Sequence, residues 1–112
     1  MARNRATAVS AILGAALAMG FQSACTRERP QVHHVAIRNF VYTPDTIAVA
    51  QGDTVVWTTE DFIPHTVTAR DSSWTSGSLN QGQTWRYVAD TPGSYPYLCT
   101  FHPNMQGTIE VR

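Results

Sequence analysis

The chain has 112 residues, with eight arginines, no lysine and eight acidic residues, so its formal net charge at pH 7 is zero. This length allows one domain at most. The arginines are scattered along the chain, which excludes the basic patch or stripe expected of a nucleic-acid-binding protein.

The N-terminal segment has the pattern of a secretory signal. Arg3 and Arg5 precede an uncharged, small and apolar stretch, and no further charged residue occurs until Arg27. A basic region followed by an apolar region is typical of a signal peptide, which we assign to residues 1–24. The alternative is an uncleaved membrane anchor, because the uncharged stretch is nearly long enough to span a bilayer. Either interpretation predicts an exported, periplasmic or extracytoplasmic protein.

Two cleavage sites compete in this segment. The "ALA" at 16–18 suits an ordinary signal peptidase, whereas Ser23, Ala24 and Cys25 resemble a bacterial lipoprotein signal, in which the cysteine is lipidated. Gln22 departs from that pattern, which usually has an aliphatic residue there. If Cys25 is lipidated, the polar segment 25–34 is a tether between the membrane surface and the domain; otherwise Cys25 leaves with the signal peptide.

The domain is expected at 35–112, and its residue pattern is that of β-structure. Alternation along 53–59 and 83–90 predicts strands with one buried and one exposed face, with Trp57 and Trp85 in the core. Several short strands with frequent turns predict an antiparallel sandwich or barrel. Runs of Val, Ile, Thr, Tyr and Trp, separated by Gly-, Pro-, Asn- and Asp-rich turns, mark the candidate strands 34–42, 46–50, 53–59, 65–69, 84–89, 94–98 and 107–111.

Three potential metal ligands lie close together near the C-terminus, in "LCTFHPNMQG". Cys99, His102 and Met105 are each separated by two residues, and Pro103 stiffens the loop between them. Thioether sulfur is a poor zinc ligand, whereas thiolate with thioether favours copper. On this segment alone, a surface His102 and a core Met105 remain an equal alternative.

A distant histidine extends the set. His65 lies 34 residues before Cys99 at the end of another candidate strand, and it can equally be an ordinary loop histidine. Two imidazoles and one thiolate in a plane, with a weak axial thioether, form the copper site of electron-transfer proteins. His33 and His34 at the end of the tether are interpreted as solvated residues rather than ligands.

Three stretches, 39–67, 74–85 and 91–111, resemble the cupredoxins, specifically the small plastocyanin/amicyanin-like blue copper proteins. The resemblance implies a Greek-key β-sandwich/barrel of about seven to eight strands. It also implies one type 1 copper, with His65, Cys99 and His102 as equatorial ligands and Met105 as the long axial ligand. Thr66 stands where many members have an asparagine that braces the two ligand loops.

A donor set that is closed by protein favours electron transfer over catalysis, because no position remains for a substrate. We therefore expect a monomeric electron carrier, not an enzyme, that cycles between Cu(II) and Cu(I) and meets its redox partners transiently near His102. The alternative is a periplasmic copper-binding or delivery module without redox duty. An exposed electron-entry patch is expected from Phe62, Ile63, Pro64, Phe101 and Pro103.

Overall fold

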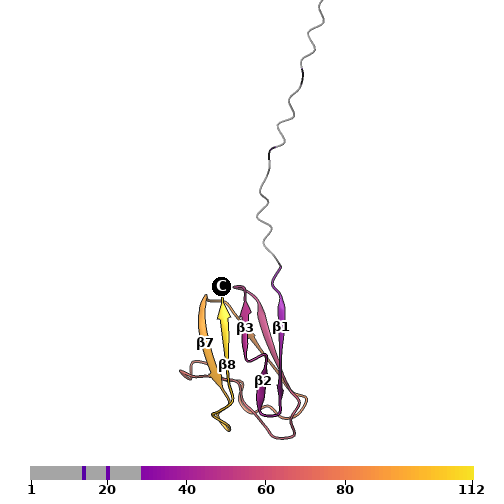
Figure 1. Cartoon of the computed structure of the whole chain (residues 1–112), viewed down its shortest axis with the longest axis vertical. Helices are drawn as coiled ribbons and strands as arrows, with labels where there is room; N and C mark the ends of the chain where they lie inside the picture. Colours follow the sequence, from indigo (N-terminus) through magenta and orange to yellow (C-terminus); the bar gives the residue numbers. More distant parts are fainter. Residues whose placement is uncertain (1–13, 15–19, 21–28) are drawn as a thin grey trace, which may run out of the picture.

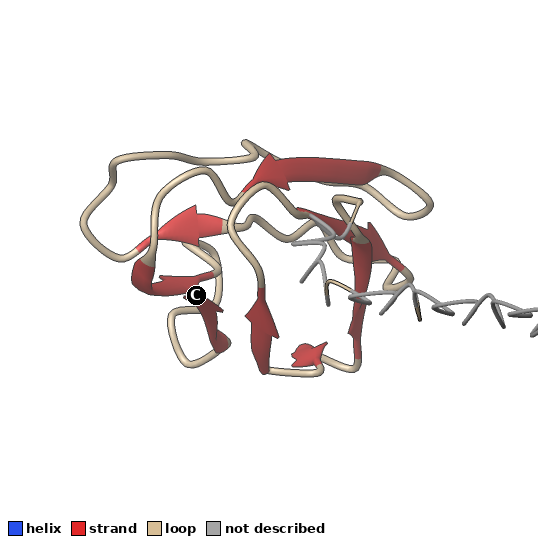
Figure 2. Cartoon of the chain, turned by 90° about the horizontal axis from the view of Figure 1, so that it is seen from above, coloured by secondary structure: helices blue, strands red, loops and turns tan. Residues whose placement is uncertain are grey.

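The computed structural model describes residues 29–112, together with Gly14 and Gly20, and within them it contains only strands and loops (Figure 2). The all-β prediction is therefore confirmed. Apart from those two glycines, the expected signal peptide lies outside the described residues, as does Cys25. The described part of the chain has no helix with the length and apolarity that a membrane span needs. The strands are β1 (Val32–Arg38), β2 (Val41–Thr43), β3 (Thr46–Val49), β4 (Thr54–Thr59), β5 (Thr68–Ala69), β6 (Thr84–Val88), β7 (Gly93–Leu98) and β8 (Gln106–Val111).

The strands form two four-stranded sheets, with the orders β2-β1-β4-β6 and β3-β8-β7-β5. Each sheet is mixed, because β1 pairs with β4 and β3 pairs with β8 in parallel; the parallel direction of β3 and β8 is visible in Figure 1. The expectation of a wholly antiparallel sandwich is therefore wrong. Two parallel strands need a crossover connection. The connection from β1 to β4 runs through β2, in the same sheet, and then through β3, in the second sheet.

The candidate strand at 34–42 is interrupted by a tight turn. Asn39 and Phe40 have φ values of 53° and 60°, in the left-handed region, so β1 ends at Arg38 and β2 starts at Val41. Asparagine tolerates this region, but an aromatic residue rarely adopts it. Contacts with the rest of the domain must therefore stabilise this backbone conformation of Phe40, and those contacts come from residues of the candidate metal centre.

The apolar core lies between the two sheets, and its largest fully buried side chains include Trp57 and Tyr97. Val55, Val56 and Trp57 are buried in succession, so the expected alternation is wrong in β4. The reason is its central place in the sheet: Val56 lies between its cross-strand partners His34 and Arg86, whose side chains flank it on the outer face. The edge strand β6 does alternate.

Strand β1 begins at Val32 and thus takes in three residues that the sequence analysis assigned to the tether. The carboxylate of Asp53 explains the early start. Its Oδ1 accepts the Gln31 backbone N–H at 2.8 Å, and its Oδ2 lies 2.8 Å from Nε2 of His33. His33 is therefore half-buried and paired, whereas His34 is exposed.

We expect Asp53→Asn to destabilise the domain by roughly 1–3 kcal/mol, because an amide NH2 would face the N–H donors that the carboxylate now accepts. Hydrogen bonds from the Gln31 backbone, the His33 side chain and the Ala50 backbone hold the pKa of Asp53 below its ordinary value. A lowered folded-state pKa means that this stabilisation is present above the unfolded pKa of about 3.9 and is lost as pH falls through the folded value.

Urea unfolding from pH 7 down to pH 3 tests this, with Asp90→Asn as the control, since Asp90 is exposed and its carboxylate has only a local partner. The stability difference between Asp53→Asn and the wild type should shrink at the acid end. A difference that is independent of pH would contradict the assigned role of the carboxylate.

Candidate metal centre

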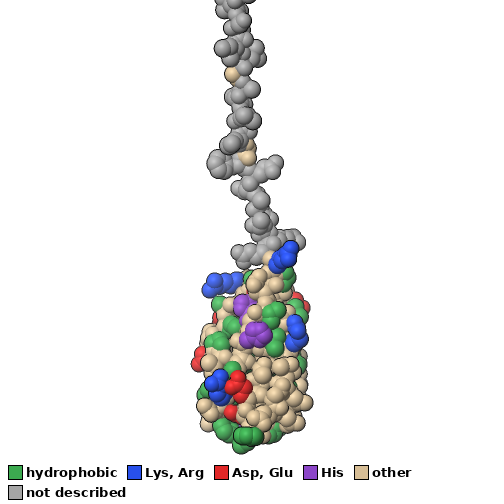
Figure 3. Space-filling model, turned by 90° about the vertical axis from the view of Figure 1, so that its right-hand side faces the viewer, with side chains coloured by type: hydrophobic (Ala, Val, Ile, Leu, Met, Phe, Trp, Pro, Cys, Tyr) green, Lys and Arg blue, Asp and Glu red, His purple; other side chains and the backbone are tan. Residues whose placement is uncertain are grey.

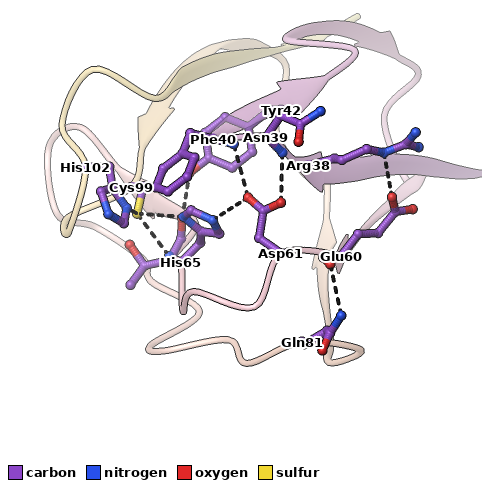
Figure 4. A network of polar contacts seen from close by, with 11 residues as sticks. Arg38, Asn39, Phe40, Tyr42, Glu60, Asp61, His65, Gln81, Cys99 and His102 are labelled. Atoms are coloured by element: carbon purple, nitrogen blue, oxygen red, sulfur yellow. Dashed lines mark hydrogen bonds and ion pairs between the residues drawn. The ribbon is translucent and has the colours of Figure 1, made fainter.

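Three donor atoms converge at the end of the sandwich where β1 ends and β8 begins, the lower end in Figure 1. His65 comes from the loop between β4 and β5, while Cys99 and His102 come from the loop between β7 and β8. The Cys99 Sγ lies 3.8 Å from Nδ1 of His65 and 3.6 Å from Nδ1 of His102 (Figure 4). One ligand atom from each residue lies within 4.8 Å of the others.

Backbone hydrogen bonds hold both loops. His65 and Leu79 exchange a pair of them, with N···O distances of 3.1 and 2.7 Å, so the His65 loop is pinned to the segment that precedes β6. In the other loop, the Met105 N–H donates to the His102 carbonyl at 2.8 Å and the Cys99 N–H donates to the Met105 carbonyl at 3.1 Å. These two bonds close the seven-residue loop on itself. Met105 is 4% exposed and belongs to the core cluster.

Thr66 connects the two loops. Its Oγ1 accepts the Thr100 backbone N–H at 2.9 Å, and its own backbone N–H donates to the Cys99 sulfur at 3.3 Å. Thr68 donates its hydroxyl to the same Thr66 oxygen at 3.0 Å, which orients it. The bracing role that the resemblance assigns to an asparagine is thus carried out by a threonine with two threonine neighbours.

Asp61 is a site residue that the sequence analysis missed. Its Oδ2 lies 2.8 Å from Nε2 of His65, on the opposite side of the ring from the sulfur (Figure 4). The same carboxylate accepts the backbone N–H groups of Asn39 and Phe40, at 2.8 and 3.1 Å. Burial raises the pKa of Asp61, but these hydrogen bonds outweigh that effect and leave the pKa below its ordinary value. The signal in the sequence was an acid four residues before His65.

Phe40, which the sequence analysis also missed, covers both imidazoles. Its ring meets the rings of His65 and His102 edge-on, with centroids 5.3 and 4.9 Å apart and interplanar angles near 90°. Asp61 therefore fixes two things at once: the orientation of the His65 ring and the left-handed turn that places Phe40 against it. Such strained turns persist where the surrounding contacts determine them.

The five residues expected to form an electron-entry patch are all exposed. Phe62 is the extreme, with 89% of its surface accessible, and Ile63 and Phe101 are about half exposed. They lie in the two loops that carry the donors, and Phe40 and Val41 add further exposed apolar surface from the β1–β2 turn. Figure 3 shows apolar side chains gathered at this lower end of the domain.

The distances between the donor atoms and their chemistry can be compared with those of known kinds of metal site. With bond lengths of about 2.0–2.3 Å, as in zinc sites, a nitrogen and a sulfur at two corners of a trigonal plane lie roughly 3.7 Å apart. The observed separations of 3.6 and 3.8 Å fit this arrangement. Two imidazoles and a single thiolate, with a buried methionine in the same loop, suit copper better than the all-Cys/His sets of structural zinc sites.

We expect Asp61→Asn to weaken Cu(II) binding by about 10–100-fold, the usual cost of removing a partner that orients a ligand. The side-chain amide of the variant has only one acceptor oxygen. Its NH2 group would therefore face at least one of the N–H groups that now donate to the Asp61 carboxylate. Competition with a chromophoric chelator measures the affinity. Glu60→Gln is the matched control, because Glu60 is exposed and pairs only with the exposed Arg38. Equal affinities for the two variants would contradict the role assigned to Asp61.

Comparisons with known proteins agree with this geometry. Residues 9–111 match the family model described as a cupredoxin-like domain. The amicyanin-alpha of Methylorubrum extorquens is 29% identical, over 96% of this chain and 98% of its own length. A plastocyanin of Scenedesmus fuscus is also 29% identical, over 64% of this chain and 87% of its own length. A purple cupredoxin from Nitrosopumilus maritimus superposes with a TM-score of 0.68 and 29% identity, over 71% of this chain and 99% of its own.

Proposed function

This chain belongs to the cupredoxin-like family, and from that premise we propose that it carries single electrons between exported redox partners through one copper held by His65, Cys99, His102 and Met105. It is a small blue copper protein and an electron carrier rather than an enzyme. The observation that supports the proposal most directly is the convergence of three donor atoms, with two Nδ1 atoms 3.6 and 3.8 Å from one thiol sulfur.

Bound copper would supply a one-electron couple, Cu(II)/Cu(I), whose potential depends on the axial ligand and on hydrogen bonding around the cysteine sulfur. The chain's own residues hold the donors in place for both oxidation states. Asp61 fixes the His65 ring, and Thr66 ties the two loops together. The Thr66 N–H also donates to the Cys99 sulfur, which withdraws charge from a thiolate and so favours the reduced state.

Electrons would enter and leave at the His102 end. The His102 side chain is only half-buried, and the exposed patch of Phe62, Ile63, Pro64, Phe101 and Pro103 surrounds the donor loops. An apolar surface of this kind suits a small, short-lived interface, which a redox shuttle needs for rapid release. The half-exposed ring of Phe40 enlarges this surface.

We also propose that the chain is exported as a monomer and that its N-terminal segment, 1–24, is removed, with Cys25 lipidated and 25–34 as a tether to the membrane surface. Support comes from the residue pattern of the segment and from the burial of Cys99, which leaves Cys25 without an evident disulfide partner. The intact mass of the membrane fraction, with and without Cys25→Ser, tests this. An unmodified Cys25 in the mature chain would refute the anchor.

The main experiment is to load the purified protein with Cu(II), record visible and EPR spectra, and measure its electron self-exchange. We expect a strong thiolate-to-copper band, an unusually small copper hyperfine splitting and rapid exchange. A colourless protein would refute the proposed centre. A coloured protein that exchanges electrons slowly, yet passes copper readily to a second chelator, would favour a delivery module instead.

A further inference from the structure

All three tryptophans and all four tyrosines of the chain belong to one continuous set of ring contacts. We call this set the aromatic chain; its members are Tyr42, Trp57, Trp74, Trp85, Tyr87, Tyr95 and Tyr97. The phenylalanines that the structure describes are Phe40, Phe62 and Phe101, and all three are exposed at the metal end. The tryptophan and tyrosine rings, which can be oxidised, therefore form one connected set, and the described phenylalanine rings, which are much harder to oxidise, lie outside it.

The inner end of the aromatic chain reaches the metal centre. Tyr97 lies two residues before Cys99 on the same face of the chain, and both are fully buried. Its ring is 5.4 Å from Trp57, whose Nε1–H donates to the Tyr97 hydroxyl at 3.2 Å, and 4.7 Å from Tyr42. The Tyr42 hydroxyl donates to the carbonyl of Thr66, the residue whose N–H donates to the Cys99 sulfur.

The outer end of the aromatic chain reaches solvent at residues that are not part of the patch. Trp57 is followed by Trp85 at 5.5 Å, and Trp85 stacks on Trp74 at 5.6 Å with an interplanar angle of 29°. Trp74 also returns directly to Tyr97 at 6.3 Å. Trp74 and Trp85 are half-buried, in the loop after β5 and on the edge strand β6, whereas the patch belongs to other loops. Each step lies within the range of aromatic contacts.

We infer that the aromatic chain is a second electron route, which conducts an electron from the reduced metal centre to a one-electron oxidising radical arriving at Trp74 or Trp85. The inference rests on the proposed function, because that function supplies the electron. This route would give the domain an activity that does not use the patch around His102. The domain would be protected from oxidative damage, because the oxidation would be transferred from the outer tryptophans to the metal centre, which can be reduced again.

The electron balance is simple. The radical takes one electron from Trp74 and becomes its reduced anion, Trp74 regains one through Trp85 and Trp57, and a reduced copper held by the donors would supply the last electron. No bond forms or breaks. Tryptophan can pass through a radical cation without losing its proton, whereas tyrosine loses its phenol proton on oxidation, and the Tyr97 hydroxyl accepts a hydrogen bond from Trp57. The tryptophans are therefore the main carriers, with Tyr97 as the last ring before Cys99.

Pulse radiolysis with azide radicals, which oxidise tryptophan, tests the inference on the reduced copper-loaded protein and on the Zn(II)-loaded protein. In the zinc protein we expect a long-lived tryptophan radical absorption, because Zn(II) cannot donate an electron. In the reduced copper protein the same absorption should decay in a first-order process, while the thiolate-to-Cu(II) band rises at the same rate. Equal radical lifetimes in the two proteins would overturn the inference.

The double variant Trp74→Phe/Trp85→Phe keeps apolar rings at both positions and removes the outer half of the route. It should slow the first-order rise by an order of magnitude or more and leave electron self-exchange and the EPR spectrum unchanged. An unchanged first-order rise would overturn the route through these tryptophans. Failure of the proposed function is recognised separately, because a protein without the thiolate-to-copper band would still show tryptophan radicals in its zinc form.

Discussion

Replacement of Cys99 by serine will abolish the intense visible absorption of the copper-loaded protein and reduce its electron self-exchange below detection. The Cys99 sulfur lies 3.8 and 3.6 Å from the Nδ1 atoms of His65 and His102, and the residue is fully buried. A hydroxyl is a harder and far less acidic donor, so it cannot replace the soft, covalent bond that favours copper with thiolate. The core should tolerate the change, since serine is close to cysteine in volume.

Cys25→Ser makes the same substitution at the other cysteine and is therefore the matched control. It should keep the absorption band, the EPR spectrum and the self-exchange rate of the wild type. A comparison of the two variants therefore distinguishes the cysteine that binds copper, Cys99, from the cysteine that does not, Cys25. A strong thiolate band that survives Cys99→Ser, or one that is lost in Cys25→Ser, would contradict the assignment of the donor.

Replacement of Gly107 by alanine will destabilise the domain by about 3 kcal/mol, the upper end of the cost of overpacking a core. A Cβ at this position would overlap the Cζ and hydroxyl of Tyr97, its cross-strand partner, and lie 2.8 Å from the Asp45 carbonyl oxygen. The carbonyl is backbone and the tyrosine is fully buried, so neither can move away without disturbing the core. The absence of a side chain at 107 is what allows Tyr97 to pack there.

Urea unfolding of the metal-free protein measures this effect, and for a domain of this size the loss corresponds to a fall of roughly 10–25 °C in melting temperature. The double variant Gly107→Ala/Tyr97→Leu identifies the cause. Because the smaller side chain removes the overlap, the double variant should lose less stability than the sum of the two single variants. Strict additivity would show that the cost arises elsewhere.

The aromatic and acidic neighbours of the site were harder to find from the sequence than the donors themselves. Cys99, His102 and Met105 are close in sequence, and their residue types carry the chemistry. Asp61 and Phe40, by contrast, act through the left-handed turn at Asn39–Phe40, which is hidden inside a run of strand-forming residues. A turn of this kind depends on an acceptor more than twenty residues away, so local preference does not reveal it.

The position of β1 illustrates the same limit. The polar segment 25–34 predicts a tether, yet Val32 to His34 join the first sheet because Asp53 accepts hydrogen bonds from Gln31 and His33. Trp57 is a core residue as predicted and Trp85 packs half-buried against the core, but their contacts with Trp74 and Tyr97 are set by the packing of separate strands. Only the folded chain shows the aromatic chain as a connected path.

The sequence by itself determined the class of fold and, through its resemblance to the cupredoxins, which residues to expect as donors, because strand patterning and ligand chemistry are properties of the residues themselves. The tertiary structure decided which strands run parallel, which carboxylate orients His65 and which ring covers the imidazoles. Those features depend on contacts between residues far apart in the chain, and their geometry exists only once the two sheets have packed against each other.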